Sequence, residues 1–149
     1  MVKTKIILHP SKTALDKIFH ANTKRYRFHF SQLNPSEIIA ICSIIENYHP
    51  TTIIKIPEVA YPEKKRTPDF LIDGVRYEIK APRSIHCVHS LYTKAKKQVR
   101  KNGFIVFEYM NIENASLFDF VEKTYKYCNR IQPWGFILMN HGNILYSTR

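Results

Sequence analysis

Three charged residues, Asp69, Glu78 and Lys80, are spaced so that they could act together on a phosphodiester bond. They lie in residues 68–82, where two apolar runs are joined by Asp73-Gly74. An Asp-Gly pair between such runs predicts a β-hairpin with a two-residue loop. In that register Asp69 stands opposite Glu78, and Lys80 shares their face because side chains alternate along a strand.

Two facing carboxylates need a positive charge nearby. Directly opposed side chains have Cβ atoms about 5 Å apart, where like charges are unfavourable. A divalent metal ion such as Mg²⁺, bound by Asp69 and Glu78, could supply the charge and activate water for attack on a phosphodiester. Lys80 and Arg76 could supply it instead, which would make a metal-free site. A solvated hairpin face with ordinary cross-strand ion pairs is the simplest alternative.

The surrounding charge favours a polyanionic partner. The chain has 149 residues with 23 Lys and Arg against 12 Asp and Glu, a formal net charge of +11. Cationic contacts to phosphates release condensed counterions and so favour binding to nucleic acid. No acidic residue occurs between Ile79 and Phe107. We expect nucleic-acid contacts from five basic residues in and around this stretch: Arg76, Arg83, Lys94, Lys97 and Arg100.

The hairpin also carries a pattern known from nucleases. Pro68-Asp69, eight further residues and then Glu78-Ile79-Lys80 resemble the PD-(D/E)xK nuclease motif. The resemblance implies that Asp69 and Glu78 bind a metal ion and that Lys80 positions or activates the attacking water. The motif begins at the start of one predicted strand and continues inside the next, and a helix and a strand follow it, which strengthens the likeness.

A longer stretch is similar to a narrower family, the C-terminal tRNase domains of contact-dependent growth-inhibition toxins and related mobile-element proteins, grouped with the barnase/EndoU/colicin/RelE-like nucleases. The likeness covers roughly residues 66–149 and includes residues 67–74, residues 77–82, a basic helix with Gln98, and residues 104–106. It implies cleavage of RNA, with tRNA as the expected substrate, and Gln98 as a site residue. For a toxin, it also implies an acidic immunity or antitoxin protein as partner.

The two resemblances imply different mechanisms. Many members of the second, broad group cut RNA without a metal ion, through His, Lys, Arg, Thr or Tyr side chains. His86 or His89, in the helix predicted after the hairpin, could then act as general acid or base, because His titrates near neutral pH. Histidines in such positions are more often simply exposed, and this alternative is favoured for both. The cofactor is therefore either Mg²⁺ or none.

The remaining pattern predicts an α+β fold, a single nuclease-like domain over residues 1–149 with a mixed, mostly antiparallel sheet and helices packed on it. Residues 1–50 form an α/β part without a recognised match, and residues 51–149 form the catalytic core. We expect further strands at residues 4–8, 25–30, 51–56, 104–109, 134–139 and 144–146. We expect helices at residues 11–20, from 35 to about 49, at 85–101 and at 117–129, the last capped by Ser116.

Side chains in two of these elements alternate between buried and exposed. In the helix of residues 85–101, one stripe is apolar and should pack, namely Ile85, Val88, Tyr92, Ala95 and Val99. The opposite stripe should face solvent and contains His86, His89, Ser90, Thr93, Lys97 and Arg100. Tyr26, Phe28 and Phe30 could stack on single-stranded bases, but the same alternation favours a buried strand face.

Composition limits the location and redox state. The chain has no apolar run of about 18 residues that could span a membrane. Its basic N-terminus has an apolar run too short for a secretory signal, so we expect a cytoplasmic protein without membrane contact. Cys42, Cys87 and Cys128 are widely spaced, and we expect them to be reduced and mostly buried.

These observations lead to a first hypothesis of an RNA endonuclease, a toxin or mobile-element protein that cuts tRNA. A Mg²⁺-dependent DNA endonuclease of the PD-(D/E)xK type is the second hypothesis. A nucleic-acid-binding module without catalytic activity is the third.

Overall fold

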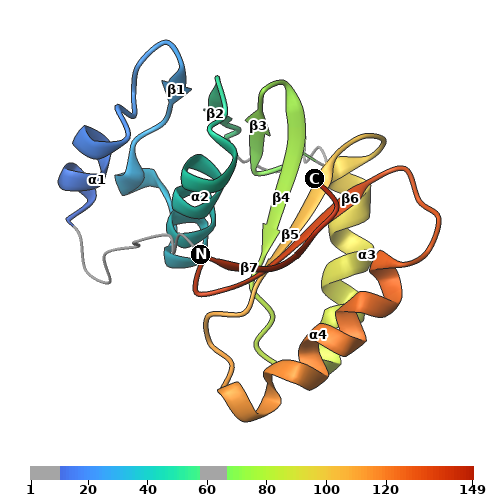
Figure 1. The fold of residues 1–149 in the computed structure, drawn as a ribbon. Coiled ribbons are helices and arrows are strands. Elements are labelled where there is room, and N and C mark those ends of the chain that lie inside the picture. The colour runs from blue at the N-terminus through green and yellow to red at the C-terminus, as the bar shows by residue number, and fades with distance from the viewer. Residues whose placement is uncertain (1–10, 58–66) are drawn as a thin grey trace, which may run out of the picture.

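The computed structural model describes residues 11–57 and 67–149. These residues form an α+β fold around a seven-stranded mixed sheet, as the sequence predicts (Figure 1). The strands lie in the sheet in chain order. They are β1 (Tyr26–Arg27), β2 (Ile53–Lys55), β3 (Phe70–Ile72), β4 (Val75–Lys80), β5 (Phe104–Glu108), β6 (Gly135–Asn140) and β7 (Asn143–Ser147).

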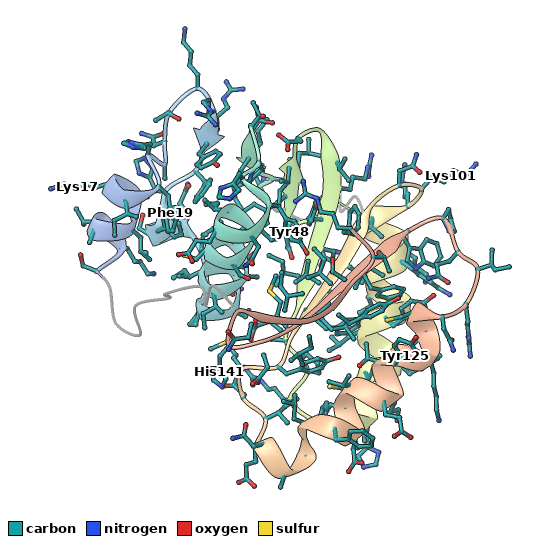
Figure 2. All side chains as sticks on the ribbon, in the orientation of Figure 1. Lys17, Phe19, Tyr48, Lys101, Tyr125 and His141 are labelled. Carbon is teal, nitrogen blue, oxygen red and sulfur yellow. The ribbon has the colours of Figure 1, made fainter. Side chains whose placement is uncertain are left out.

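Helices cover both faces of this sheet. Among the described residues they are α1 (Lys12–Ile18), α2 (Pro35–Tyr48), α3 (Val88–Val99) and α4 (Asn114–Cys128). Helix α2 packs on one face, and α3 and α4 pack on the other (Figure 1). Figure 2 shows side chains filling the space between the sheet and the helices on both sides. The two cores therefore meet only through the sheet.

The pairing of the strands follows from the helices between them. Within the described part of the chain, the β2–β3, β3–β4 and β6–β7 pairs are antiparallel, and the β1–β2, β4–β5 and β5–β6 pairs are parallel. Helices α3 and α4 each carry the chain back across the sheet, so the strands that they connect run in the same direction. The mixed sheet was expected, but antiparallel pairs do not predominate in it.

The central hairpin forms in the predicted register. Phe70 pairs with Tyr77, and Ile72 pairs with Val75 across the turn at Asp73 and Gly74. Both turn residues have positive φ, +50° and +78°, as a tight hairpin turn of this kind requires. Phe70, Ile72, Tyr77 and Ile79 are buried in the core beneath α2, so alternate side chains of the hairpin form an apolar face opposite the charged one.

The N-terminal elements agree with the sequence in part. Ser11 caps α1 through a hydrogen bond from the Ala14 N–H, and Pro35 opens α2, both as expected. The strand expected over residues 25–30 is short, because the chain turns into a 3-10 helix (Phe30–Gln32) that the Gln32 side chain closes by accepting from the His29 N–H. Tyr26, Phe28 and Phe30 are buried, as their alternation favours. The strand expected over residues 4–8 lies outside the described residues.

The C-terminal half differs from expectation at one boundary. Helix α4 begins at Asn114 with Glu113 as N-cap, so the prediction that Ser116 caps it was wrong. Ser116 lies in the first turn, where its N–H donates to the Glu113 carbonyl oxygen. Cys42, Cys87 and Cys128 are free, with Cys42 and Cys128 buried and Cys87 half-buried.

Candidate active site

Asp69 and Glu78 lie together at the open end of the hairpin, where β3 begins. The Asp69 N–H donates to Glu78 Oε1 at 3.0 Å, and the Ile79 N–H donates to Asp69 Oδ2 at 2.9 Å. Each carboxylate thus accepts a main-chain hydrogen bond from the opposite strand. These two bonds continue the hairpin pairing beyond Phe70 and hold both acids in place.

Lys80 completes the group. Its Nζ lies 2.9 Å from Glu78 Oε2, and its side chain is 17% exposed against 3% for Glu78. Glu78 is therefore satisfied on both oxygens, one by the main chain and one by the ammonium group. Within the described residues no hydrogen bond reaches Asp69 Oδ1. The structure brings together the three residues that the sequence singles out.

Two further charged residues, Glu37 and Lys55, border this group. Glu37 Oε2 lies 3.1 Å from Lys55 Nζ, and Lys55 pairs with Phe70 in the sheet, directly beside Asp69. Both charges act on the pKa of Asp69, Glu37 raising it and Lys55 lowering it. Neither residue is predicted as a site residue from the sequence. Glu37 closes a capping box with Asn34 at the start of α2. The sequence pattern explains this capping role and does not indicate that Glu37 also lies near Asp69.

The electrostatics of the pair differ from those of a solvated hairpin face. Burial raises the pKa of Glu78 to about 7, and the neighbouring Asp69 charge adds to this effect, while Lys80 opposes it. Burial also raises the pKa of Asp69, against the opposing hydrogen bond from Ile79. Two carboxylates this close do not easily both ionise unless a cation or a proton compensates their charge, and such pairs are common at functional sites.

The donor set fits one kind of metal ion. No group of three or more His, Cys, Asp or Glu side chains that could hold a metal occurs among residues 11–57 and 67–149. Structural zinc sites usually take three or four such ligands. Mg²⁺ usually keeps several waters and binds through one or two carboxylates together with substrate phosphates. Asp69 and Glu78 offer that set of hard oxygen donors.

Gln98 approaches the site from α3. Its Nε2 donates to the carbonyl oxygen of Thr67 at 3.3 Å, two residues before Asp69. Its Oε1 is buried and has no hydrogen-bond partner among the described residues. A buried amide oxygen without a partner is costly to keep unless a ligand or water meets it. Gln98 is thus the residue of α3 tied most directly to the start of β3.

The basic residues of α3 do not all point the same way. Val88, Tyr92, Ala95 and Val99 are buried against the sheet, which confirms the predicted stripe. Residues four apart lie on the same flank of a helix, so Lys94 lies one turn from Gln98 on the hairpin side. Lys97 is offset by 100° from Gln98, away from the buried stripe.

The other expected contact residues are spread more widely. Arg76 is half-buried on β4 near the hairpin turn, and Arg83 is exposed in the loop after β4. Arg100 is exposed just after α3, where it has a positive φ of 53°. No recorded contact within the described residues joins any of the three to Asp69 or Glu78. They could bind a phosphate chain only outside the carboxylate pair.

The two histidines are not part of the group. His86 is exposed in a 3-10 turn (Ile85–Cys87), and its recorded hydrogen bond is the main-chain N–H to Ser84 Oγ. His89 Nδ1 lies 2.8 Å from the Tyr127 hydroxyl, which ties it to α4 on the opposite flank of α3 from Gln98. A metal-free mechanism through either imidazole gains no support from this geometry.

The comparisons with known proteins add nothing to these observations. No family model, no curated protein and no solved structure matches this chain. In the part of the chain that the structure describes, no helix is both long and apolar enough to cross a membrane. The case for a function therefore depends on the geometry and chemistry of the site alone.

Proposed function

We propose that this protein is an endonuclease that hydrolyses phosphodiester bonds in RNA, with a divalent metal ion held by Asp69 and Glu78. The observation that carries the proposal is the buried carboxylate of Glu78, 2.9 Å from Lys80 and hydrogen-bonded to the half-buried Asp69, in a chain with a net charge of +11. Charge of that sign holds a polyanion, and paired acids beside a lysine are the groups that phosphodiester hydrolysis needs.

The proposed reaction is a simple hydrolysis. Water attacks phosphorus, one P–O ester bond breaks, and the fragments carry a phosphate and a hydroxyl. A bound divalent cation supplies charge neutralisation and a more acidic water. Lys80 stabilises negative charge beside Glu78, and the carboxylate of Asp69 would serve as the second ligand of the cation. Main-chain hydrogen bonds from Asp69 and Ile79 keep both carboxylates oriented.

The test measures cleavage of total tRNA and of plasmid DNA by the purified protein, each in Mg²⁺ and in EDTA. We expect tRNA to be cut in Mg²⁺ and not in EDTA. Glu78→Gln should lower the rate at least about 100-fold, since loss of even an outer partner of a metal ligand costs about 10- to 100-fold. His86→Ala is the matched control and should retain wild-type activity.

Other outcomes point to the alternatives. Cleavage of plasmid DNA in preference to tRNA would replace RNA by DNA as the substrate and keep the same site. Cleavage in EDTA that His86→Ala abolishes would overturn the metal-dependent mechanism. Binding of both nucleic acids without any cleavage would favour a binding module that uses the same basic surface.

A further inference from the structure

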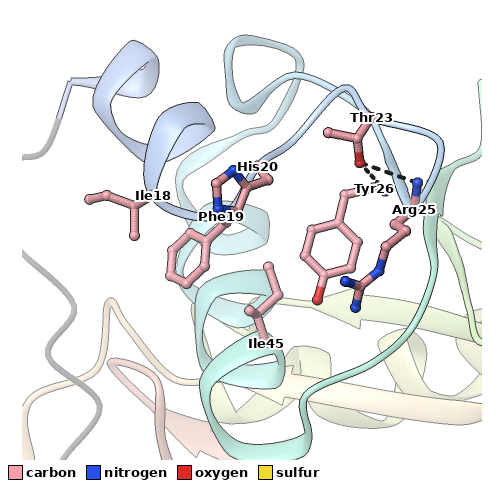
Figure 3. A pocket seen from close by; sticks show the side chains of 7 residues that line it. All are labelled: Ile18, Phe19, His20, Thr23, Arg25, Tyr26 and Ile45. Atoms are coloured by element: carbon pink, nitrogen blue, oxygen red, sulfur yellow. Dashed lines mark hydrogen bonds between the residues drawn. The ribbon is translucent and has the colours of Figure 1, made fainter.

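A second feature lies apart from the carboxylate pair. Side chains of helix α1, the following loop, β1 and α2 line a half-open cavity of about 190 Å³ (Figure 3). Phe19 and Tyr26 form aromatic walls, and Ile18 and Ile45 contribute aliphatic surface. A dry cavity of about 150 Å³ is enough for one benzene-sized ring, whereas pockets for drug-sized ligands begin at about 300 Å³. The cavity therefore fits a single flat ring system.

Arg25 gives the rim of this cavity a positive charge. His20 also lines it, and none of the described residues that line it is acidic. Arg25 Nε donates to the Thr51 carbonyl oxygen at 3.1 Å, and its guanidinium carbon lies 5.8 Å from the centre of the Tyr26 ring. Within the described residues, no recorded hydrogen bond engages the terminal nitrogens of Arg25. They can meet a phosphate at the mouth of the cavity.

The loop that forms the rim is held in shape. His20 and Asn22 both have positive φ, 50° and 59°. Thr23 Oγ1 accepts hydrogen bonds from the N–H groups of Arg25 and Tyr26 (Figure 3). The Tyr26 hydroxyl donates to the Pro50 carbonyl oxygen, and the residue is 8% exposed and stacks with Phe28, so Tyr26 is a fixed part of the wall. The aromatic surface is thus pre-organised before a ligand arrives.

We infer that this cavity binds one unpaired base of a single-stranded nucleic acid, with Arg25 on a flanking phosphate. Aromatic faces together with Arg are what proteins use for unstacked bases, and the charge of the rim selects a polyanion over a neutral ring compound. The inference depends on the proposed function for the identity of the ligand. It adds a selection for unpaired regions of the substrate.

The test uses fluorescence anisotropy with a labelled single-stranded RNA of about 12 nucleotides, within the range of site sizes for such proteins. Binding is measured in EDTA and in a Glu78→Gln background, so that cleavage does not interfere. Ile18→Glu places a negative charge at the cavity, and Ile18 is 52% exposed, which makes the change compatible with folding. Thr13→Glu is its control, because Thr13 is exposed on the same helix and does not line the cavity.

A second matched pair removes positive charge. Arg25→Gln and Lys24→Gln each delete one charge from the same loop, and of the two only Arg25 lines the cavity. We expect Ile18→Glu and Arg25→Gln to weaken binding about tenfold more than their controls, the effect of losing one stacked base. Equal effects within both pairs would overturn the inference. A cavity that binds a small aromatic compound and no RNA base would give this result.

An abasic scan of the RNA gives an independent reading. Removing a base at one position should weaken binding to the wild-type cavity about tenfold, with little further loss in Ile18→Glu, because both changes remove the same contact. Uniform small effects at every position would contradict this. Cleavage of tRNA with no difference within the pairs would reject the cavity and keep the nuclease. Position-dependent binding without cleavage would reject the nuclease and keep the cavity.

Discussion

The Asp69 N–H donates to Glu78 Oε1 across the hairpin at 3.0 Å, so the main chain of one acidic residue holds the side chain of the other. Because the Ile79 N–H in turn donates to Asp69 Oδ2, main-chain hydrogen bonds fix the two carboxylates side by side. Lys80 neutralises only part of their charge, and the pKa of Glu78 is raised to about 7. The behaviour of this pair can be tested directly.

Metal binding should release a proton near neutral pH. A metal ligand must be deprotonated, and the pKa of Glu78 is about 7, so the affinity for Mn²⁺ or Ca²⁺ should rise with pH up to about 7 and then level off. Below that pKa the expected slope is about tenfold per pH unit for one proton. Isothermal titration calorimetry at several pH values, in two buffers of different ionisation enthalpy, measures both the affinity and the proton.

The variant Glu78→Gln serves as the control for this experiment. It should bind the metal more weakly and with a shallower pH dependence, because one of the two titrating carboxylates is gone and Asp69, whose pKa burial also raises, remains. Its folding should be intact, since Gln resembles the protonated Glu78 that burial favours. A wild-type affinity that is flat between pH 5 and 8 would show that Glu78 does not bind the metal.

Lys80 should control the pH range of activity. Its charge lowers the pKa of Glu78, so Lys80→Met should move the acidic limb of the kcat/KM profile to higher pH, besides lowering the rate by about 100-fold. Lys80→Arg keeps a positive charge and should restore most of the profile, though not necessarily the rate. Steady-state cleavage from pH 5 to 9 measures both quantities. An unchanged pH profile in Lys80→Met would show that the charge of Lys80 does not set the pKa of Glu78.

The part of the site that the sequence predicts is the part that local pairing determines. A two-residue Asp73-Gly74 turn fixes the register, and the register alone brings Asp69 opposite Glu78. The alternation of apolar residues then assigns the buried face, which the structure confirms. No information beyond about ten residues of sequence separation is needed for these two steps.

Glu37 and Lys55 could not be predicted in the same way. They are 18 residues apart, on a helix and a strand that meet only in the folded sheet. The direction of Gln98 is a similar case, because periodicity separates the buried from the exposed stripe of α3 but does not say which flank faces the hairpin. The contact of His89 with Tyr127 on α4 settles that flank and removes His89 from the site.

Two lysines on α3 should contribute differently to nucleic-acid binding. Lys94 lies one turn from Gln98 on the side of the hairpin, and Lys97 is turned away from that flank; both are exposed. Lys94→Gln should therefore weaken RNA binding more than Lys97→Gln and reduce the salt dependence, the slope of log K against log salt, by about 1. Anisotropy titrations at several salt concentrations in EDTA test this. Equal slopes for both variants would show that the RNA backbone does not run along the flank of α3 that carries Lys94.

A third acidic side chain should govern stability and leave catalysis unchanged. Glu108 is fully buried at the end of β5, where Oε2 accepts a hydrogen bond from the Gly142 N–H at 3.1 Å. Its Oε1 has no partner in the described part of the chain, and burial raises the pKa of Glu108 to about 7. No recorded contact links it to Asp69 or Glu78. Glu108 is therefore a buried acid with a raised pKa outside the site, and it can be compared with Glu78.

Glu108 should make the protein less stable as the pH rises. The folded protein holds the proton up to a pH of about 7, whereas the unfolded chain releases it near 4.5, so between these values the unfolded state binds fewer protons and stability falls. Glu108→Gln cannot ionise. The difference in unfolding free energy between Glu108→Gln and wild type should therefore shift in favour of the variant by up to about 3 kcal/mol from pH 5 to pH 8. The melting temperature of the variant relative to wild type should rise in the same direction. Calorimetry at both values measures the difference, with cleavage as the control for an intact site. A pH-independent difference would show that Glu108 ionises in the folded protein as readily as in the unfolded chain.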